Sequence, residues 1–187
     1  MLRFFVDVCG AFPKSGFLHY NLPRAMRLLI GRDYRRIADV VPNLVATKNT
    51  GDGFKRARDL MTNASEIQHL FSEADFTHVC NYGPCSLLSS FCLMAPAKTK
   101  AVFEARLAGR IEDMYRLQHE FQNMLHVVLG PLLAEERINS AYDKMIVRLA
   151  GLKEFPLRLM SRSICFSEEQ YMAMEARMRE HFGVWLP

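Results

Sequence analysis

Hydrophobic and polar positions alternate with two different periods along the first part of the chain. Short apolar segments bounded by turn residues predict strands, and segments with an apolar residue every three or four positions predict helices. The predicted strands are 17–20, 44–47, 76–80 and 87–91, the last of which is also compatible with a buried helical segment. The predicted helices are 2–11, 24–40, 54–61 and 96–108, with a short helix or turn at 65–71. Strands that alternate with helices are typical of a parallel sheet.

The alternation of strands and helices stops after Gly109. Three further amphipathic segments predict helices at 110–129, 140–150 and 168–182, and Ser167 followed by Gln170 is a helix-start signal. The pattern therefore predicts an α/β fold in which about four parallel βα units, a parallel half-barrel, precede a C-terminal subdomain of three helices. The expected domains are residues 1–108, the partial barrel, and residues 109–187, the helical subdomain.

Size and composition limit the kinds of protein that this chain can be. The chain has 187 residues, of which 50% are hydrophobic and 24% are charged, and these values are typical of a globular domain. A complete (β/α)8 barrel needs about 250 residues, so the chain is long enough for only part of one. The net charge of +4 comes from basic residues that are spread along the predicted helices, a distribution that does not indicate nucleic-acid binding.

The cysteines and the lack of long apolar segments favour a reducing compartment. The five cysteines include no Cys-x-x-Cys pair and no spacing with histidine that is typical of zinc sites, so we expect free thiols and no metal. No segment reaches 18 consecutive apolar residues, and residues 1–10 lack the apolar region of a signal peptide. We therefore expect a cytoplasmic protein without a membrane partner.

Tyr20 and Lys48 are the candidate reactive residues. Each lies at or just past the end of a short apolar segment, and the interval between them suffices for one strand, one helix and a second parallel strand beside the first. The two side chains would then meet at the carboxyl ends of neighbouring strands, where α/β folds bind ligands. A partly desolvated lysine there can attack a ketone and form a Schiff base while the phenol transfers protons. Taken singly, Lys48 reads as a solvated lysine and Tyr20 as a core aromatic residue.

Two motifs carry a resemblance to a known family. Leu-His-Tyr-Asn-Leu-Pro at 18–23, followed by Leu-Val-Ala-Thr-Lys-Asn-Thr-Gly-Asp at 44–52, resembles the dihydrodipicolinate synthase / N-acetylneuraminate lyase family. That family consists of (β/α)8 barrels that bind pyruvate or a related 2-keto acid as a Schiff base and need no cofactor. The resemblance covers most of this chain but only the second half of that fold.

The resemblance implies roles for individual residues. Lys48 would form the Schiff base, and Tyr20 would relay protons at the substrate. Thr47 would contribute to substrate binding if it faced the barrel rather than the helices, a choice that the sequence leaves open. Asn81 and Tyr82 follow the predicted third strand, where the family has a glycine-containing loop near the substrate, and would bind substrate there.

The chain also departs from the family pattern. Position 25 is alanine where the synthase branch has an arginine that holds a substrate carboxylate, and Arg24 lies one position earlier. The first four βα units of the barrel have no counterpart in this sequence. We therefore expect impaired activity and association, either as a homo-oligomer or with a complementary barrel half. Gly51 is expected to shape the turn after the Lys48 strand. The alternative function is a non-catalytic remnant or interaction module that retains the half-barrel fold.

Overall fold

The chain folds into two compact units, one from Met1 to Ser89 and the other from Ser90 onward. The structure, a computed structural model, describes residues 1–50, 53–160 and 163–186. The expected division into a barrel part and a helical part at residue 108 stays a prediction about domains.

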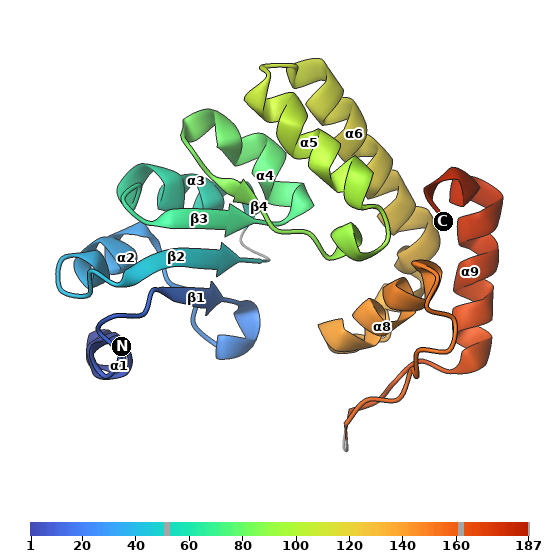
Figure 1. Ribbon diagram of the computed structural model, residues 1–187, viewed down its shortest axis with the longest axis horizontal. Helices are drawn as coiled ribbons and strands as arrows, with labels where there is room; N and C mark the ends of the chain where they lie inside the picture. Colours follow the sequence, from blue (N-terminus) through green and yellow to red (C-terminus); the bar gives the residue numbers. More distant parts are fainter. Residues whose placement is uncertain (51–52, 161–162, 187) are drawn as a thin grey trace. The chain divides into compact units, whose positions relative to one another are not determined.

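The first unit is built on a parallel sheet of four strands, as the sequence predicts (Figure 1). The strands lie in the order β1-β2-β3-β4, and each pairs in parallel with the next one along the chain. Their bounds are Phe17–Asn21 for β1, Leu44–Asn49 for β2, Gln68–Phe71 for β3 and Ser86–Leu87 for β4. Sequential order with parallel pairing is the arrangement of successive βα units in a (β/α)8 barrel. The predicted half-barrel fold is therefore confirmed.

Helices connect the strands and pack on one face of the sheet (Figure 1). Tyr34, Leu60 and Phe76, from three successive helices, are fully buried with Phe71 of β3. Gly31 lets two of these helices approach closely, because a methyl group there would lie 2.6 Å from a backbone carbonyl oxygen of the next helix. The helices of this unit are α1 (Leu2–Gly10), α2 (Gly31–Ala38), α3 (Gly53–Asn63) and α4 (Glu73–Val79), with 3-10 turns at Pro23–Ala25 and Cys80–Tyr82.

The predicted third strand is wrong. Residues 76–80 belong to α4 and to the 3-10 turn that follows it. The first turn of α4 carries two acidic side chains, which the helix dipole favours, and Phe76 and Val79 are buried three positions apart on one helix face. The third strand of the sheet is β3, which lies inside the segment 65–71 that the sequence suggests as a short helix or turn.

The helix predicted at 24–40 is shorter in the structure, where only α2 is α-helical, and hydrogen bonds of a nearby side chain explain why. The side chain of Asn21 accepts a hydrogen bond from the backbone N–H of Leu29 (2.9 Å) and donates one to the backbone carbonyl of the same residue (3.1 Å). These two bonds hold residues 26–30 in an irregular loop between β1 and α2. The fourth strand is also shorter than predicted, since residues 90–93 form a 3-10 turn.

The second unit is helical. Its helix-start signal is confirmed, because the Ser167 hydroxyl accepts the N–H of Gln170 (3.2 Å) and the Gln170 side chain accepts the N–H of Ser167 (2.9 Å). These two bonds fix the first turn of the last long helix. The helices of this unit are α5 (Pro96–Leu107), α6 (Ile111–Met124), α7 (Gly130–Leu133), α8 (Asn139–Leu149) and α9 (Glu168–Phe182), with a 3-10 turn at Gly183–Trp185.

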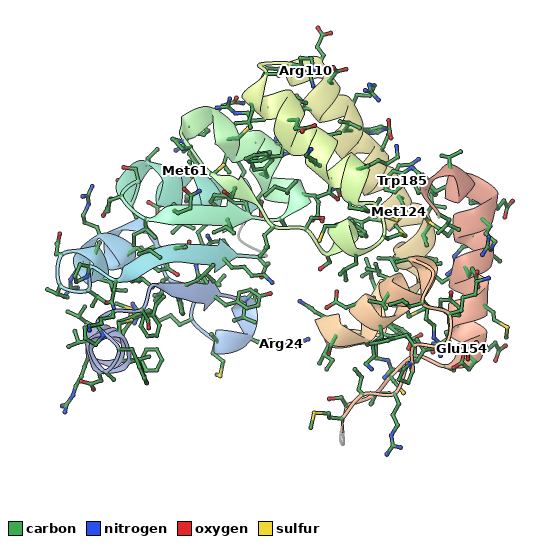
Figure 2. The ribbon with its side chains drawn as sticks, in the orientation of Figure 1. Arg24, Met61, Arg110, Met124, Glu154 and Trp185 are labelled. Carbon is green, nitrogen blue, oxygen red and sulfur yellow. The ribbon has the colours of Figure 1, made fainter. Side chains whose placement is uncertain are left out.

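Helical structure continues past the point at which the sequence predicts a stop. Leu125–Leu129 forms a wider π-helical turn, and α7 follows it directly. Pro131 has no N–H to donate to the preceding turn, and a π turn accommodates such a break in the hydrogen-bond pattern. The surrounding core is rich in methionine, and Met124 and Trp185 are two of its buried side chains (Figure 2).

Two sequence-based expectations can be compared directly with the structure. All five cysteines are free thiols, as expected. In the parts of the chain that the structure describes, no helix combines the length and the apolar character needed to cross a bilayer.

Candidate functional site

Tyr20 and Lys48 lie side by side at the carboxyl ends of β1 and β2. They are cross-strand partners in the parallel register of the two strands. The Nζ atom of Lys48 lies 4.1 Å from the centroid of the Tyr20 ring, and both side chains are half-buried. The juxtaposition that the sequence predicts from the spacing of the two motifs is therefore present in the structure.

The pair lies on the face of the sheet opposite the one on which the described helices of the first unit pack. Side chains alternate between the two faces of a strand, so the cross-strand register assigns each residue to a face. Leu18, two positions before Tyr20, is 49% exposed. The other side chains of this face are also half-buried or exposed: Tyr20, Ala46, Lys48, Gln68, Leu70 and Ser86. Lys48 is thus accessible to a small molecule on this face.

A chain of buried hydrogen bonds runs along the opposite face. Asn21 Nδ2 donates to Asn49 Oδ1 (3.2 Å), and Asn49 Nδ2 donates to Thr47 Oγ1 (2.8 Å). Thr47 Oγ1 lies 2.7 Å from His69 Nδ1, and His69 Nε2 lies 2.9 Å from the carbonyl oxygen of Ala64. Because a carbonyl oxygen only accepts, His69 carries its proton on Nε2 and accepts the Thr47 hydroxyl proton at Nδ1.

This chain of hydrogen bonds lies directly behind the reactive pair. Asn21 follows Tyr20 in the sequence, and Asn49 follows Lys48. The two asparagines are opposite each other across the strands, as Tyr20 and Lys48 are. The bond between the two asparagines therefore ties together the strand ends that present the phenol and the amine. Its signal in the sequence is the polar side chains at the helix-facing positions near the two strand ends, which are Asn21 in β1 and Thr47 and Asn49 in β2.

The structure places Thr47 among the helices. Its side chain is fully buried and points away from the face that carries Lys48. Of the two orientations that the sequence leaves open, the one towards the helices is observed. Thr47 is in this way a support of the β2 strand end, and it does not lie beside Lys48 on the open face.

Replacing Thr47 with valine should destabilise the protein. The substitution keeps the side-chain shape but leaves the buried His69 Nδ1 without a hydrogen-bond donor and removes the shorter of the two hydrogen bonds of the Asn49 amide nitrogen, at a cost of about 1–3 kcal/mol. Urea unfolding of both proteins measures the difference. The control is Thr62→Val, since the exposed Thr62 hydroxyl bonds only to carbonyls of its own helix, and its effect should stay within about 0.5 kcal/mol. Equal losses for the two variants would contradict the role given to Thr47.

Burial lowers the pKa of His69, although its backbone hydrogen bond to Ala64 and the charge of Glu66 oppose the shift. Burial lowers the pKa of His19 as well. In each case the unfolded chain binds a proton more readily than the folded one. The stability that depends on the neutral rings is therefore fully present above the unfolded pKa of about 6.5 and is lost as the pH falls below it.

The free energy of unfolding should consequently fall between pH 7.5 and pH 5.5. The slope contributed by each histidine reaches at most about 1.4 kcal/mol per pH unit. Urea unfolding across this range should show a smaller slope for His69→Asn than for the wild type. The control Thr62→Val, which removes no titratable group, should keep the wild-type slope. A slope that is unchanged in His69→Asn would show that His69 does not titrate as inferred.

Asn81 and Tyr82 do not occupy the position from which their role was predicted. Both are exposed residues of the 3-10 turn between α4 and β4, and no strand ends there. The Tyr82 ring packs near Phe54 of α3, with 6.0 Å between the ring centroids. The structure brings neither residue together with Lys48. Their predicted role in substrate binding assumed that they follow a strand end, and in the structure they do not.

The turn after β2 is described only in part. Gly51 lies outside the described residues, so its predicted role stays a prediction. Thr50, just before it, donates its backbone N–H to the carbonyl oxygen of Asn21 (3.4 Å), which continues the β1–β2 pairing beyond Lys48. Gly53, at the start of α3, has a φ of 66°, a left-handed conformation that glycine adopts without steric cost.

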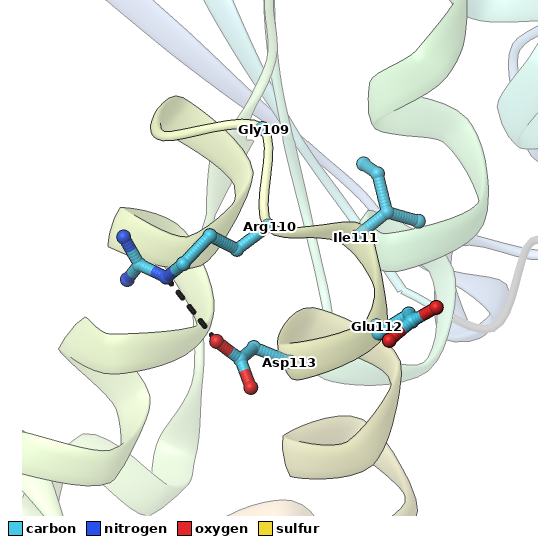
Figure 3. A pocket seen from close by; sticks show the side chains of 5 residues that line it. All are labelled: Gly109, Arg110, Ile111, Glu112 and Asp113. Atoms are coloured by element: carbon cyan, nitrogen blue, oxygen red, sulfur yellow. Dashed lines mark ion pairs between the residues drawn. The ribbon is translucent and has the colours of Figure 1, made fainter.

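Surface hollows elsewhere do not offer comparable chemistry. One of about 460 Å³ is lined by residues 109–113, where Arg110 Nε pairs with Asp113 (3.2 Å) at the start of α6 (Figure 3). Another of about 450 Å³ is lined by Ile30, Lys55, Arg56 and Asp59. In the second hollow the Asp59 carboxylate accepts hydrogen bonds from the Gly31 N–H (2.7 Å) and from the Asn63 amide (2.7 Å), so both of its oxygens support the fold of the first unit. Over the described residues, no group of three or more histidine, cysteine or acidic side chains is arranged to hold a metal ion.

Comparisons with known proteins agree with this geometry at the level of the fold. No family model matches the sequence, and no curated protein matches it. Solved structures do match. Dihydrodipicolinate synthase from Aquifex aeolicus superposes with a TM-score of 0.80 at 15% identity, over 99% of this chain and 61% of that protein. A dihydrodipicolinate synthase family protein from Coccidioides immitis gives 0.73 at 20% identity, over 98% and 59%.

A third match carries a bound small molecule. YagE, a prophage protein of the dihydrodipicolinic acid synthase family from E. coli K12, was solved in complex with pyruvate and matches with a TM-score of 0.75 at 15% identity. This chain covers 60% of that protein, and 96% of this chain is matched. The chain thus spans about 60% of the length of the structures that it resembles, and over that length it has the fold of the dihydrodipicolinate synthase family.

Proposed function

We propose that the chain carries the Schiff-base site of a carbon–carbon lyase or synthase that acts on pyruvate or a related 2-keto acid. Lys48 is the nucleophile and Tyr20 the proton-transfer group. The single observation that carries the proposal is the cross-strand pairing of the two residues at the carboxyl ends of β1 and β2, with 4.1 Å between the Lys48 Nζ and the Tyr20 ring.

The chemistry of the pair follows from the residue types. The neutral amine of Lys48 attacks the carbonyl carbon of the keto acid, the carbonyl oxygen leaves as water, and a protonated imine forms. The imine draws electrons from the neighbouring carbon, so that a bond to that carbon can break or form. The Tyr20 hydroxyl supplies and removes the protons that these steps require. The protonated imine acts as the electron sink in this scheme.

Three further observations support the proposal. The pair lies on the accessible face of the sheet, where a small molecule can reach it. The buried asparagine pair behind it fixes the relative position of the two strand ends. The fold is that of a family in which one solved member holds pyruvate. The proposal names the class of reaction and the keto-acid substrate. It does not name the second substrate or the direction of the reaction.

The test is to trap the imine. The protein is incubated with pyruvate and sodium borohydride, digested and mapped by mass spectrometry. A reduced pyruvate adduct on the peptide that contains Lys48, formed faster than on other lysine peptides, is the expected result. Labelling of Lys48 no faster than that of exposed lysines such as Lys100 would favour the alternative, a non-catalytic module that retains the half-barrel fold.

A further inference from the structure

We propose that the face of the Tyr20 ring, and not its hydroxyl alone, acts on the reaction by holding the imine nitrogen of Lys48 in its protonated, cationic form. This inference rests on the proposed function for its biological meaning. It can also be tested with a carbonyl compound that is not a keto acid. It assigns to Tyr20 two separable tasks, one for the hydroxyl and one for the aromatic face.

The geometry is that of a cation on an aromatic face. The Lys48 Nζ lies 4.1 Å from the ring centroid, well inside the distance of about 6 Å at which the negative face of a ring attracts a cation. The half-buried position of both side chains strengthens this attraction, because water screens it less. Cross-strand pairing of the two residues fixes the contact through the backbone.

Other lysines over aromatic rings in this protein have a second partner. Lys98 lies over Trp185 and also pairs with Glu120 at 2.7 Å. Lys144 lies over Phe155 and donates to a backbone carbonyl at 3.0 Å. For Lys48, within the described part of the chain, the structure shows the contact with the Tyr20 ring and no ion pair with a carboxylate. Among the residues that the structure describes, the ring is therefore the partner shown for the charge on this nitrogen.

The chemical consequence lies in which atom carries the charge. The lysine ammonium and a ketone give a protonated imine and water, and the positive charge stays on Nζ throughout the net reaction. Loss of the imine proton removes that charge, and the neutral imine is a poor electron sink. A ring face that attracts the cation therefore favours the reactive, protonated imine over the neutral one.

Cyanoborohydride gives the readout, because it transfers hydride to the carbon of a protonated imine and leaves a stable secondary amine. The rate of labelling at Lys48 should fall at high pH as the imine loses its proton. The ring contact is expected to increase the proton affinity of the imine about 2- to 30-fold, so the high-pH limb of the profile should lie about 0.3–1.5 pH units lower when the ring is removed.

The variants separate the ring from the hydroxyl. Tyr20→Phe should keep the high-pH limb in place while slowing turnover about 10²–10⁴-fold, since only the proton-transfer group is lost. Tyr20→Leu should move the limb to lower pH. Phenylalanines with one, two and three ring fluorines at position 20 keep the shape of the ring but weaken its negative face. Each added fluorine should move the high-pH limb further towards lower pH. Lys100, which is 75% exposed on α5, is the internal reference, and its labelling should not respond to these changes.

Two carbonyl compounds distinguish the failure of this inference from the failure of the proposed function. Propanal tests the ring contact without any recognition of a keto acid, and pyruvate tests both. A ring-dependent limb with propanal but no Lys48 adduct with pyruvate would support the ring contact and overturn the keto-acid function. A high-pH limb at the same pH in the wild type, in Tyr20→Leu and in the fluorinated series would overturn the role given to the ring. So would the absence of any Lys48 adduct with both compounds.

Discussion

Lys48→Ala should abolish imine trapping at the sheet while leaving the fold intact. The Lys48 side chain is half-buried and has no ion pair within the described residues, so its removal breaks the ring contact alone. With pyruvate and borohydride, the adduct on the 48-containing peptide must disappear, and total incorporation should drop to the level of slow labelling at surface lysines. Turnover, in any preparation in which the wild type has measurable activity, should fall to the uncatalysed rate because the covalent step is lost.

Two further variants make this result specific. Lys48→Arg keeps a cation over the Tyr20 ring but cannot form an imine, since the arginine side chain is always protonated. It should match Lys48→Ala in trapping and the wild type in thermal stability. Lys100→Ala removes an exposed lysine that pairs with Glu104 on α5 and should leave the yield unchanged. An equal yield of keto-acid adduct in the wild type and Lys48→Ala would remove Lys48 from the mechanism.

The position of this reactive pair was predictable because it depends on local pattern and one topological rule. The short apolar segments 17–20 and 44–47 end at Tyr20 and just before Lys48, and the interval between them fits one helical crossover. Parallel strands joined in this way present their carboxyl ends together. The spacing alone does not determine the register of the two strands. In the structure Tyr20 is directly opposite Lys48. A shift of one residue would have put the two side chains on opposite faces of the sheet.

The third strand could not be predicted because it begins with polar residues, although it lies in the middle of the sheet with one face buried. β3 begins with Gln68 and His69, and the His69 ring is buried only because Thr47 and Ala64 satisfy both of its nitrogens. Those partners are distant in sequence or set by the tertiary structure. The segment around Phe76 and Val79, by contrast, is apolar and β-branched enough to resemble a strand, and becomes a helix because its buried side chains recur at helical spacing.

The support behind the site was missed for a related reason. The Asn21 side chain has two tasks, and the first is local: it holds the backbone of Leu29 in the loop after β1. Its second task, the bond to Asn49 across the sheet, joins residues 28 positions apart. Such a bond is visible only when the strand register is known. Sequence reasoning therefore found the candidate reactive groups more readily than the groups that hold their strand ends in place.

The isolated chain should self-associate at micromolar concentration. β1 and β4 are the outer strands of the sheet, and in the described residues each has one edge without a paired strand. Unpaired edges template pairing with another chain. The open face of the sheet, which carries Lys48, adds apolar surface, with Leu18 at 49% exposure, and each 100 Å² of such surface left in water forgoes about 2.5 kcal/mol. A second copy that covers the face and an edge would recover part of this free energy.

Sedimentation velocity tests the association, with the monomer fraction as the measured quantity. The wild type should sediment as dimers or larger species, and Leu18→Lys, which places a charge on the open face, should raise the monomer fraction. Val184→Lys is the matched control, because Val184 is 91% exposed and lies outside the sheet. A separate first half of such a barrel, if added, should compete with the second copy for the same face. A wild-type chain that sediments as a monomer, unfolds cooperatively and turns over keto acids at full rate would contradict the prediction, since an open sheet of this size would then need no cover.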